Sequence, residues 1–166
     1  MSDRIPMTPR GKAMLDDELK RLKTQERPRI VKEIEIARAH GDISENAEYH
    51  AAKERQGQIE ARIRLLDDRL ARAQVIDGRG QSTEKVSFGA TVVLSDVASG
   101  EEVAYRIVGE DEADIALGMI SVTSPVARAI MGKERDASVR VQVPKGVREF
   151  EILEIRFELN AGVSAS

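Results

Sequence analysis

The chain has 166 residues, of which 33% are charged and only 3% aromatic, and its formal net charge is −3. The absence of cysteine excludes disulfides and thiolate metal sites, and the small negative charge argues against broad, sequence-independent nucleic-acid binding. No apolar run is long enough to span a membrane, and the first residues resemble no signal peptide, so we expect a cytoplasmic protein. Few aromatic and many charged residues favour a solvated coiled coil with a modest globular unit over one large core.

The first predicted element is a long helix. Thr8 followed by Pro9 places a hydroxyl at the N-cap and a proline at the first helical position, where its missing N–H costs nothing. The helix is expected to continue to about residue 39 and to end before Gly41, which suits the left-handed conformation found at C-caps. We expect a kink at Pro28, because an internal proline removes a backbone hydrogen bond and clashes with the preceding turn.

A second helix is expected from about residue 45 to residue 74. Apolar residues of the second helix recur in alternating steps of three and four, which is the spacing of a coiled-coil seam, and the first helix carries a similar stripe. The seam positions are Leu15, Leu19, Leu22, Glu26, Ile30, Ile34 and Ala37 in the first helix and Tyr49, Ala52, Gln56, Ile59, Ile63, Leu66, Leu70 and Ala73 in the second. Folding the chain about residue 43 pairs the two stripes along their length, so the segment between them is expected at the tip of a helical hairpin.

Beyond the second helix the apolar pattern changes to a period of two, which is typical of strands. The segments with this pattern are residues 86–94, 102–108, 115–122, 138–143 and 150–157. Ser124 and Pro125 repeat the cap-then-proline opening of a helix, and Gly132 ends the short helix that follows. The prediction is an α+β fold, with an N-terminal antiparallel coiled-coil hairpin followed by a small antiparallel β-sheet domain with one short helix.

Four segments follow from this division of the chain. Residues 1–78 form a coiled-coil finger with an acidic tip, and residues 79–82 are the linker. Residues 83–158 form the sheet domain, and residues 159–166 are expected to be a flexible tail.

The acidic tip is the strongest candidate site, and two interpretations of Asp42 and Glu45 are open. Their spacing is that of a capping box, in which the Asp side chain accepts from a backbone N–H of the first helical turn. Two carboxylates presented together also suit Mg²⁺, which prefers oxygen ligands. These residues, even with Glu48, are too few for a tight site on an exposed tip, so another molecule would have to supply further ligands. Both interpretations can hold, because a capped tip is also rigid.

Other polar residues surround the tip. Arg38, Lys53 and Arg55 are predicted to form a small basic cluster, which is either a solvated face with helical ion-pair partners or a contact surface for nucleic-acid phosphates. His40 and His50 flank the tip without the partner spacing expected of metal ligands or of a nucleophile–base pair. We interpret both histidines as surface residues.

A series of short motifs runs in order along nearly the whole chain. The motifs are Ile5-Pro6-Met7-Thr8, His40-Gly41-Asp42, Glu45-Asn46-Ala47-Glu48-Tyr49-His50-Ala51-Ala52, Ala73-Gln74-Val75-Ile76-Asp77, Phe88-Gly89-Ala90-Thr91-Val92, Tyr105-Arg106-Ile107-Val108-Gly109, Asp111-Glu112-Ala113-Asp114, Ile120-Ser121-Val122, Ser124-Pro125, Ala127-Arg128 and Gly132-Lys133. Each is weak alone, but together they closely resemble the GreA/GreB family of bacterial transcript-cleavage factors. The resemblance is to the GreA branch, since Glu33 and Glu35 interrupt the basic residues of the first helix.

The resemblance implies a coiled-coil finger and an FKBP-like domain without isomerase activity. It also implies that the protein, as a monomer, acts on RNA polymerase, with the sheet domain docked at the rim of the secondary channel and the finger inside it. Its expected function is to stimulate Mg²⁺-dependent endonucleolytic cleavage of backtracked nascent RNA by the polymerase active site. No stand-alone enzymatic activity is expected.

Family roles are carried over position by position. Asp42 and Glu45 match the two tip acids, which are expected to help hold a Mg²⁺ ion shared with the polymerase, with no metal bound to the protein alone. Arg38 and Lys53 match basic positions near the tip and, together with Arg55, are expected to contact the nascent RNA near its 3′ end. The residues expected to bind polymerase are Ser124, Pro125, Arg128 and Lys133.

Two alternative functions remain open at this point. A non-cleaving regulator would enter the same polymerase channel, although the intact pair of Asp42 and Glu45 argues against it. A chaperone-like coiled-coil adaptor would need an exposed apolar groove or tip, whereas the tip of this chain is acidic.

Overall fold

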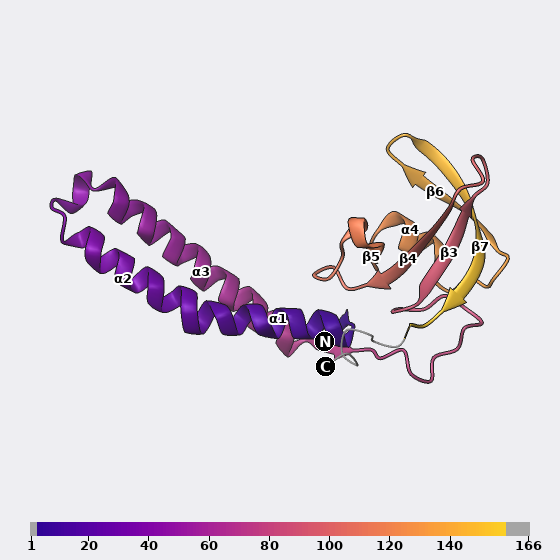
Figure 1. Ribbon diagram of the computed structural model, residues 1–166, viewed down its shortest axis with the longest axis horizontal. Coiled ribbons are helices and arrows are strands. Elements are labelled where there is room, and N and C mark those ends of the chain that lie inside the picture. Colours follow the sequence, from indigo (N-terminus) through magenta and orange to yellow (C-terminus); the bar gives the residue numbers. More distant parts are fainter. Residues whose placement is uncertain (1–2, 159–166) are drawn as a thin grey trace. The chain divides into compact units, whose positions relative to one another are not determined.

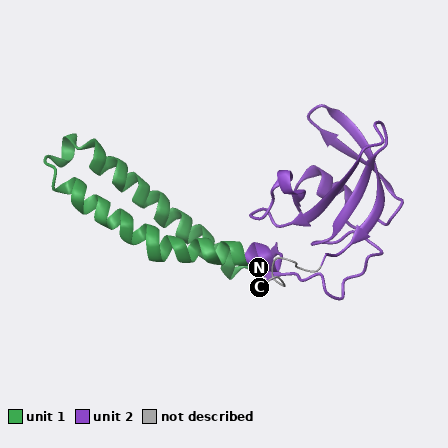
Figure 2. Cartoon of the chain, in the orientation of Figure 1, with its two compact units in different colours: residues 1–2, 13–72 green, residues 3–12, 73–166 purple. Residues whose placement is uncertain are grey.

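The structure is a computed structural model that describes residues 3–158, and it contains two compact units (Figures 1 and 2). The first unit comprises Ala13–Arg72. The second combines Asp3–Lys12 with residues 73–158, so the beginning of the first helix belongs with the sheet domain. Within the described range, no helix is both long and apolar enough to cross a membrane.

The first unit is a helical hairpin (Figure 1). Its first arm is a continuous run of α1 (Pro9–Arg21), the π-helical turn η1 (Leu22–Glu26) and α2 (Arg27–Arg38), and its second arm is α3 (Ala47–Ala71). Every predicted seam position is buried or half-buried, whereas most of the residues between them are exposed. The predicted coiled-coil stripes are therefore confirmed.

The irregularity expected at Pro28 takes the form of a π-helical turn. Pro28 lies at the start of α2, and the N–H of Arg27 bonds to the carbonyl of Leu22, five residues earlier. In a regular helix the ring of Pro28 would clash with the carbonyl of Thr24. The wider π turn relieves this clash, and such turns are a recognised cause of helix bending.

Charged pairs bridge the two arms of the hairpin. Arg27 makes two hydrogen bonds of 2.9 Å to Glu60, and Arg62 makes bonds of 2.7 and 2.8 Å to Glu18. The bond from Arg62 holds the pKa of Glu18 below its ordinary value, and the bond from Arg27 does the same for Glu60. Solvent screens exposed pairs of this kind, so they contribute little stability and only support the register that the apolar seam sets.

The second helix is shorter than predicted at both ends. It begins at Ala47 and ends at Ala71, and Ala73–Val75 instead form strand β2, which pairs in parallel with strand β1 (Ile5–Met7). The seam pattern continues to residue 73, and for that reason the sequence predicted helix there. The pairing with β1 lies far away in sequence, so no local pattern indicated it.

The predicted N-cap of the first helix is confirmed. The Thr8 hydroxyl accepts from the N–H of Gly11 at 3.0 Å and also donates to the carboxylate of Glu112. Arg10 donates to the same carboxylate at 3.0 Å. Glu112 is only 3% exposed, so a buried acid ties the first turn of α1 to the loop after β4 (Glu102–Val108), within the second unit.

The second unit contains a five-stranded sheet in the order β5-β4-β3-β7-β6. The strands not yet introduced are β3 (Thr91–Asp96), β5 (Met119–Ser121), β6 (Ser138–Val143) and β7 (Gly146–Arg156). Strands β4 and β6 have the predicted bounds. The sheet is antiparallel except at its edge, where β5 runs parallel to β4, so the expectation of a wholly antiparallel sheet is wrong there.

Two predicted strands are shorter than expected. Residues 86–90 contribute to the core without forming a regular strand, and Ile115–Leu117 form a 3-10 turn, η3, capped by Asp114. Gly118 adopts a positive φ of 75° directly after that turn, which breaks the alternation of a strand.

One short helix, α4 (Pro125–Ile130), covers the core of the sheet domain as predicted. Ala127 and Ile130 of this helix pack with the inward side chains of the sheet. The core residues are Val86, Phe88, Ala90, Val92, Leu94, Ile107, Ile120, Ala127, Ile130, Val139, Val141, Phe150, Ile152 and Ile155. The predicted fold class, a helical hairpin followed by a small sheet domain with one short helix, is confirmed for residues 3–158.

Candidate functional site

The closed end of the hairpin connects α2 to α3 through a short irregular turn. After α2 the chain reverses at Gly41, whose φ of 128° is a conformation that favours glycine. A single 3-10 turn, η2 (Ile43–Glu45), then leads to Asn46, which precedes α3. Asp42 and Glu45 both lie in this exposed turn, so the structure brings the two predicted acids to the tip.

Asp42 is held in one orientation by its neighbour. Its Oδ1 accepts from the backbone N–H of Ser44 at 3.0 Å and from the Ser44 hydroxyl at 2.9 Å. These two bonds, the backbone one first, hold the pKa of Asp42 below its ordinary value. Asp42 is therefore ionised at neutral pH, with Oδ1 occupied by Ser44 and the carboxylate exposed to solvent.

Glu45 has no such structural role. A capping box would require its side chain to bond back to the turn, but no hydrogen bond or ion pair of the Glu45 carboxylate occurs among residues 3–158. Asp42 caps only the 3-10 turn, and the N-cap of α3 is Asn46, whose side chain accepts from Tyr49. The capping interpretation is thus wrong for Glu45 and for the start of α3.

The acids line an open hollow of about 460 Å³ at the tip. Its lining residues are His40, Asp42, Glu45, Asn46, Ala47 and Glu48. In the part of the chain that is described, no group of three or more acidic or histidine side chains is arranged to hold a metal ion. Both histidines are exposed as expected, and His50 lies edge-on against Tyr49 with ring centroids 5.5 Å apart.

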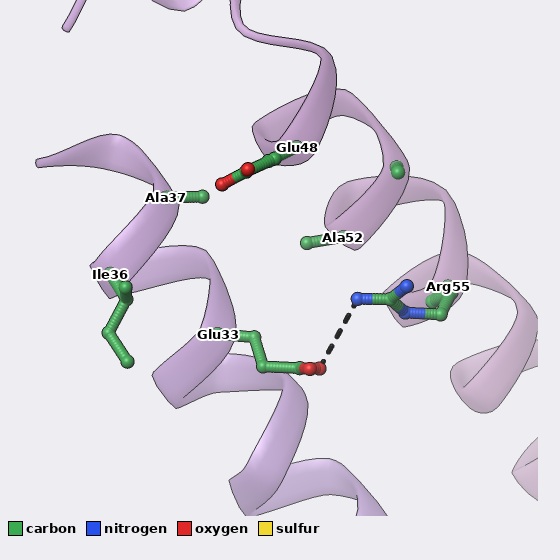
Figure 3. Close-up of a pocket in the computed structure, with 7 residues that line it drawn as sticks. Glu33, Ile36, Ala37, Glu48, Ala52 and Arg55 are labelled. Carbon is green, nitrogen blue, oxygen red and sulfur yellow. Dashed lines mark hydrogen bonds and ion pairs between the residues drawn. The ribbon is translucent and has the colours of Figure 1, made fainter. Parts of the chain in front are cut away.

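The three basic residues predicted to form one cluster have different neighbours in the structure. Arg38 places its guanidinium 5.8 Å from the ring centroid of Tyr49, and Lys53 donates to the side chain of Gln56 at 3.1 Å. Arg55 pairs with Glu33 of the other arm at 3.4 Å (Figure 3). Among the residues described, Arg55 is therefore the only one of the three with an ion-pair partner.

Behind the tip, a second hollow of about 330 Å³ lies between the helices (Figure 3). Three alanines and the pair of Glu33 and Arg55 account for most of its lining. The residues are Glu33, Ile36, Ala37, Glu48, Ala51, Ala52 and Arg55. The alanines leave this space because their side chains are too short to fill it.

The residues predicted to bind a partner through the sheet domain lie at the N-cap of α4, on the helix and after it. The Ser124 hydroxyl accepts from the N–H of Ala127 at 3.3 Å, so it caps the helix. Pro125, Arg128 and Lys133 are exposed. Ser124 thus has a structural role, and the exposed charges of Arg128 and Lys133 are available to a partner.

Sequence reasoning missed the roles of two residues. Asn46 caps α3 and also crosses to the other arm, and Glu112 anchors the first turn of α1. The preference for asparagine at N-caps could have indicated the first role. The role of Glu112 depends on a contact with Thr8, 104 positions away in sequence, and has no local signal.

Comparison with known families matches both parts of the chain. Residues 5–75 match the family model described as transcription elongation factor, N-terminal, and residues 81–157 match the model described as transcription elongation factor, GreA/GreB, C-term. Together the two models cover most of the sequence.

Curated proteins named transcription elongation factor GreA are similar along nearly their whole length. The protein from Trichlorobacter lovleyi is 57% identical over 158 residues, which are 95% of this chain and 100% of the relative. The protein from Phenylobacterium zucineum is 56% identical over 155 residues, which are 93% of this chain and 99% of the relative.

Two solved structures of more distant proteins also align with the chain. GreA factor homolog 1 (Gfh1) of Thermus thermophilus is 28% identical with a TM-score of 0.43, covering 93% of this chain and 99% of that one. The elongation factor GreA/GreB from Nitrosomonas europaea is 21% identical with a TM-score of 0.42, covering 93% of this chain and 100% of that one.

Proposed function

The chain belongs to the GreA/GreB family of transcription elongation factors, and we propose that it stimulates cleavage of backtracked nascent RNA by RNA polymerase. In this proposal the hairpin enters the secondary channel of the polymerase and the sheet domain docks at its rim. The protein has no catalytic activity of its own and acts in the cytoplasm, where bacterial transcription takes place.

One observation carries the proposal: two acids lie at the closed end of a helical hairpin without a complete site around them. Asp42 is ionised, and the Glu45 carboxylate is exposed without an intramolecular partner. An exposed acid without a structural bond, such as Glu45, contributes nothing to the fold beyond a weak interaction with a helix end. Their position at the end of a narrow hairpin suits delivery into a cleft of another molecule.

These two acids fit a shared magnesium ion better than a resident one. Asp42 and Glu45 supply oxygen ligands, the type that Mg²⁺ prefers, but the ion requires near-octahedral coordination. The remaining ligands would have to come from water and from the polymerase, because the described residues offer no larger acidic group. When bound, the ion would supply electrostatic stabilisation of the reacting oxygens and a more acidic water.

The remaining contacts are proposed from charge and exposure. Arg38, Lys53 and Arg55 are exposed near the tip, and their positive charge supports a contact with RNA phosphates close to the cleavage position. Arg128 and Lys133, exposed on and after α4, are proposed to contact the polymerase, with Ser124 holding the start of that helix.

The test is cleavage of nascent RNA in purified, stalled elongation complexes. Asp42→Asn and Glu45→Gln remove one negative charge each and preserve the shape of the side chain, and asparagine can still accept from Ser44. Each variant is expected to lower the stimulated cleavage rate about 10²–10³-fold, the scale of removing one electrostatic group from a transition state. Binding to polymerase, measured separately by co-migration or anisotropy, is expected to stay within about twofold because the docking contacts are unchanged.

A charge-matched control is available on α3, beyond the tip. Glu54→Gln removes an exposed acid away from the tip and is expected to leave cleavage unchanged. Normal cleavage by either tip variant would overturn the proposed role of the acids. Polymerase binding by the unaltered chain without cleavage would indicate a non-cleaving regulator, and absence of polymerase binding would indicate an adaptor of other proteins.

A further inference from the structure

Asn46 makes two hydrogen bonds in opposite directions at the tip. Its Nδ2 donates to the carbonyl of Ala37 in the last turn of α2 at 2.6 Å. Its Oδ1 accepts from the N–H of Tyr49 in the first turn of α3 at 3.0 Å. Asn46 is half-buried, whereas Glu45 and Ala47 on either side of it are exposed. One side chain therefore connects the two arms of the hairpin.

The amide is well suited to this pair of bonds because it carries a donor and an acceptor on one plane. The final carbonyls of a helix and its first N–H groups both lack partners within the helix. Asn46 supplies a partner to the N–H of Tyr49 and a second donor to the carbonyl of Ala37, which also accepts from the N–H of His40 at 3.1 Å. An aspartate, a serine or a threonine at this position could accept from Tyr49, but aspartate has no N–H to donate, and the hydroxyls are shorter.

A second contact closes the hairpin beside the first. The guanidinium of Arg38 lies 5.8 Å from the ring centroid of Tyr49. Arg38 directly follows Ala37, and Tyr49 lies in the first turn of α3, which Asn46 caps. Ala37 is itself buried, with 5% of its surface exposed. The two ends of the acidic turn are therefore fixed relative to each other.

The acids lie between these fixed ends. Ala37 and Asn46 are nine positions apart, and Asp42 and Glu45 fall between them. Within the turn, the N–H of Glu45 bonds to the carbonyl of Asp42 at 3.3 Å, and the N–H of Asn46 bonds to the carbonyl of Ile43 at 3.2 Å. The 3-10 turn that presents both acids thus ends at Asn46 itself.

We infer that Asn46 is a positioning residue for Asp42 and Glu45, acting through its bond to the Ala37 carbonyl. This inference rests on the proposed function, since it concerns the placement of the acids that the function requires. Asn46 touches neither the RNA nor the metal in this role. Its effect is to keep the acidic turn in one arrangement before the polymerase supplies the other ligands.

Asn46→Asp removes the bond to the Ala37 carbonyl and keeps the bond from the Tyr49 N–H. The aspartate keeps an acceptor for Tyr49, so the cap of α3 survives, but a carboxylate oxygen then faces the Ala37 carbonyl and repels it. The maximum cleavage rate at saturating factor is expected to fall about 10–100-fold, the range found when groups that orient metal ligands are removed. The factor concentration at half-maximal rate is expected to stay within about twofold, because the polymerase contacts are intact.

A matched control corrects for the added charge. Ala47→Asp also adds one negative charge beside the acids, at an exposed first-turn position where it is tolerated, and it leaves both bonds of Asn46 in place. An equal loss of cleavage in Ala47→Asp would overturn the inference, because charge alone would then explain the result. An unchanged maximum rate in Asn46→Asp would overturn it as well.

A measurement on the free protein makes the test independent of cleavage. Heteronuclear ¹⁵N relaxation of the full chain is expected to show increased fast motion of the Ser44 and Glu45 amides in Asn46→Asp but not in Ala47→Asp. Unchanged relaxation would overturn the positioning role. If Asp42→Asn and Glu45→Gln cleave normally, the proposed function fails, while the relaxation result still decides whether Asn46 orders the turn.

Discussion

The two ends of the first helical arm use carboxylates in opposite ways. Near the start of α1, Glu112 is buried and accepts hydrogen bonds from Thr8 and Arg10. At the far end of the hairpin, Glu45 is exposed and makes no bond of this kind within the described chain, and Asp42 bonds only to its neighbour Ser44. Both regions contain short acidic motifs beside a helix end, and the sequence alone does not distinguish their roles.

Burial and partners distinguish these acids. A buried carboxylate must be satisfied, because an unpaired one costs several kcal/mol, so Glu112 is bound to the structure around it. An exposed carboxylate costs nothing to maintain and remains available to a partner. The comparison predicts that changes near the start of α1 alter stability, whereas changes to the acids at the tip alter function.

The largest stability effect is expected for Glu112→Ala. Removing this carboxylate leaves the buried Thr8 hydroxyl without its acceptor and the half-exposed Arg10 without its acidic partner. The free energy of unfolding is expected to fall by about 1–3 kcal/mol. Urea denaturation followed by circular dichroism measures the change. Glu45→Gln is expected to change the free energy of unfolding by less than about 0.5 kcal/mol. An equal destabilisation by Glu45→Gln would contradict the contrast between the buried and the exposed acid.

A smaller effect of opposite sign is expected for Gly57→Ala in the second arm. A Cβ at this helical position meets no atom within 4 Å, so alanine should stabilise the hairpin by about 0.4–1 kcal/mol through reduced freedom of the unfolded chain. Gly109→Ala is the matched control near the start of α1, because its Cβ would lie 2.7 Å from the carbonyl oxygen of Pro6 and should destabilise. Denaturation midpoints that move in the same direction for both variants would contradict this contrast.

The smallest effect is expected for Ser44→Ala, which removes one of the two bonds to Asp42. The pKa of Asp42 should rise but stay below the ordinary 3.8, because the backbone N–H of residue 44, the larger cause of the shift, remains. A lowered pKa means that the stabilisation from these bonds is present above pH 3.8 and is lost as the pH falls through the lower folded value. NMR titration of the Asp42 carboxyl carbon measures the change, and an unmoved midpoint would show that the hydroxyl contributes nothing.

Much of the hairpin was predictable because its signals are local. The three-four spacing of residues such as Ile30, Ile34 and Ala37 repeats with the period of a helix, and the seam it defines is buried as expected. The cap of Thr8 and the helix that follows Ser124 were also predicted, since a cap depends on residues within one turn.

The candidate site was predicted only in part. Its acids were identified, but Asp42 was expected to cap the second helix and instead caps a 3-10 turn. Asn46 is the N-cap of α3. Arg55 was grouped with Arg38 and Lys53 because all three are near in sequence. The structure instead pairs Arg55 with Glu33 on the opposite arm, a partner that no local pattern could indicate.

The sequence by itself determined that this chain has a helical hairpin with acids at its closed end, because helix periodicity and the break between two periodic segments are local properties. Tertiary structure decided which acids are structural and which are exposed. Glu112 meets Thr8 across 104 positions, and Asn46 meets Ala37 across nine positions of a reversing turn. Such contacts depend on how the whole chain folds back on itself, and burial then determines what each carboxylate can do.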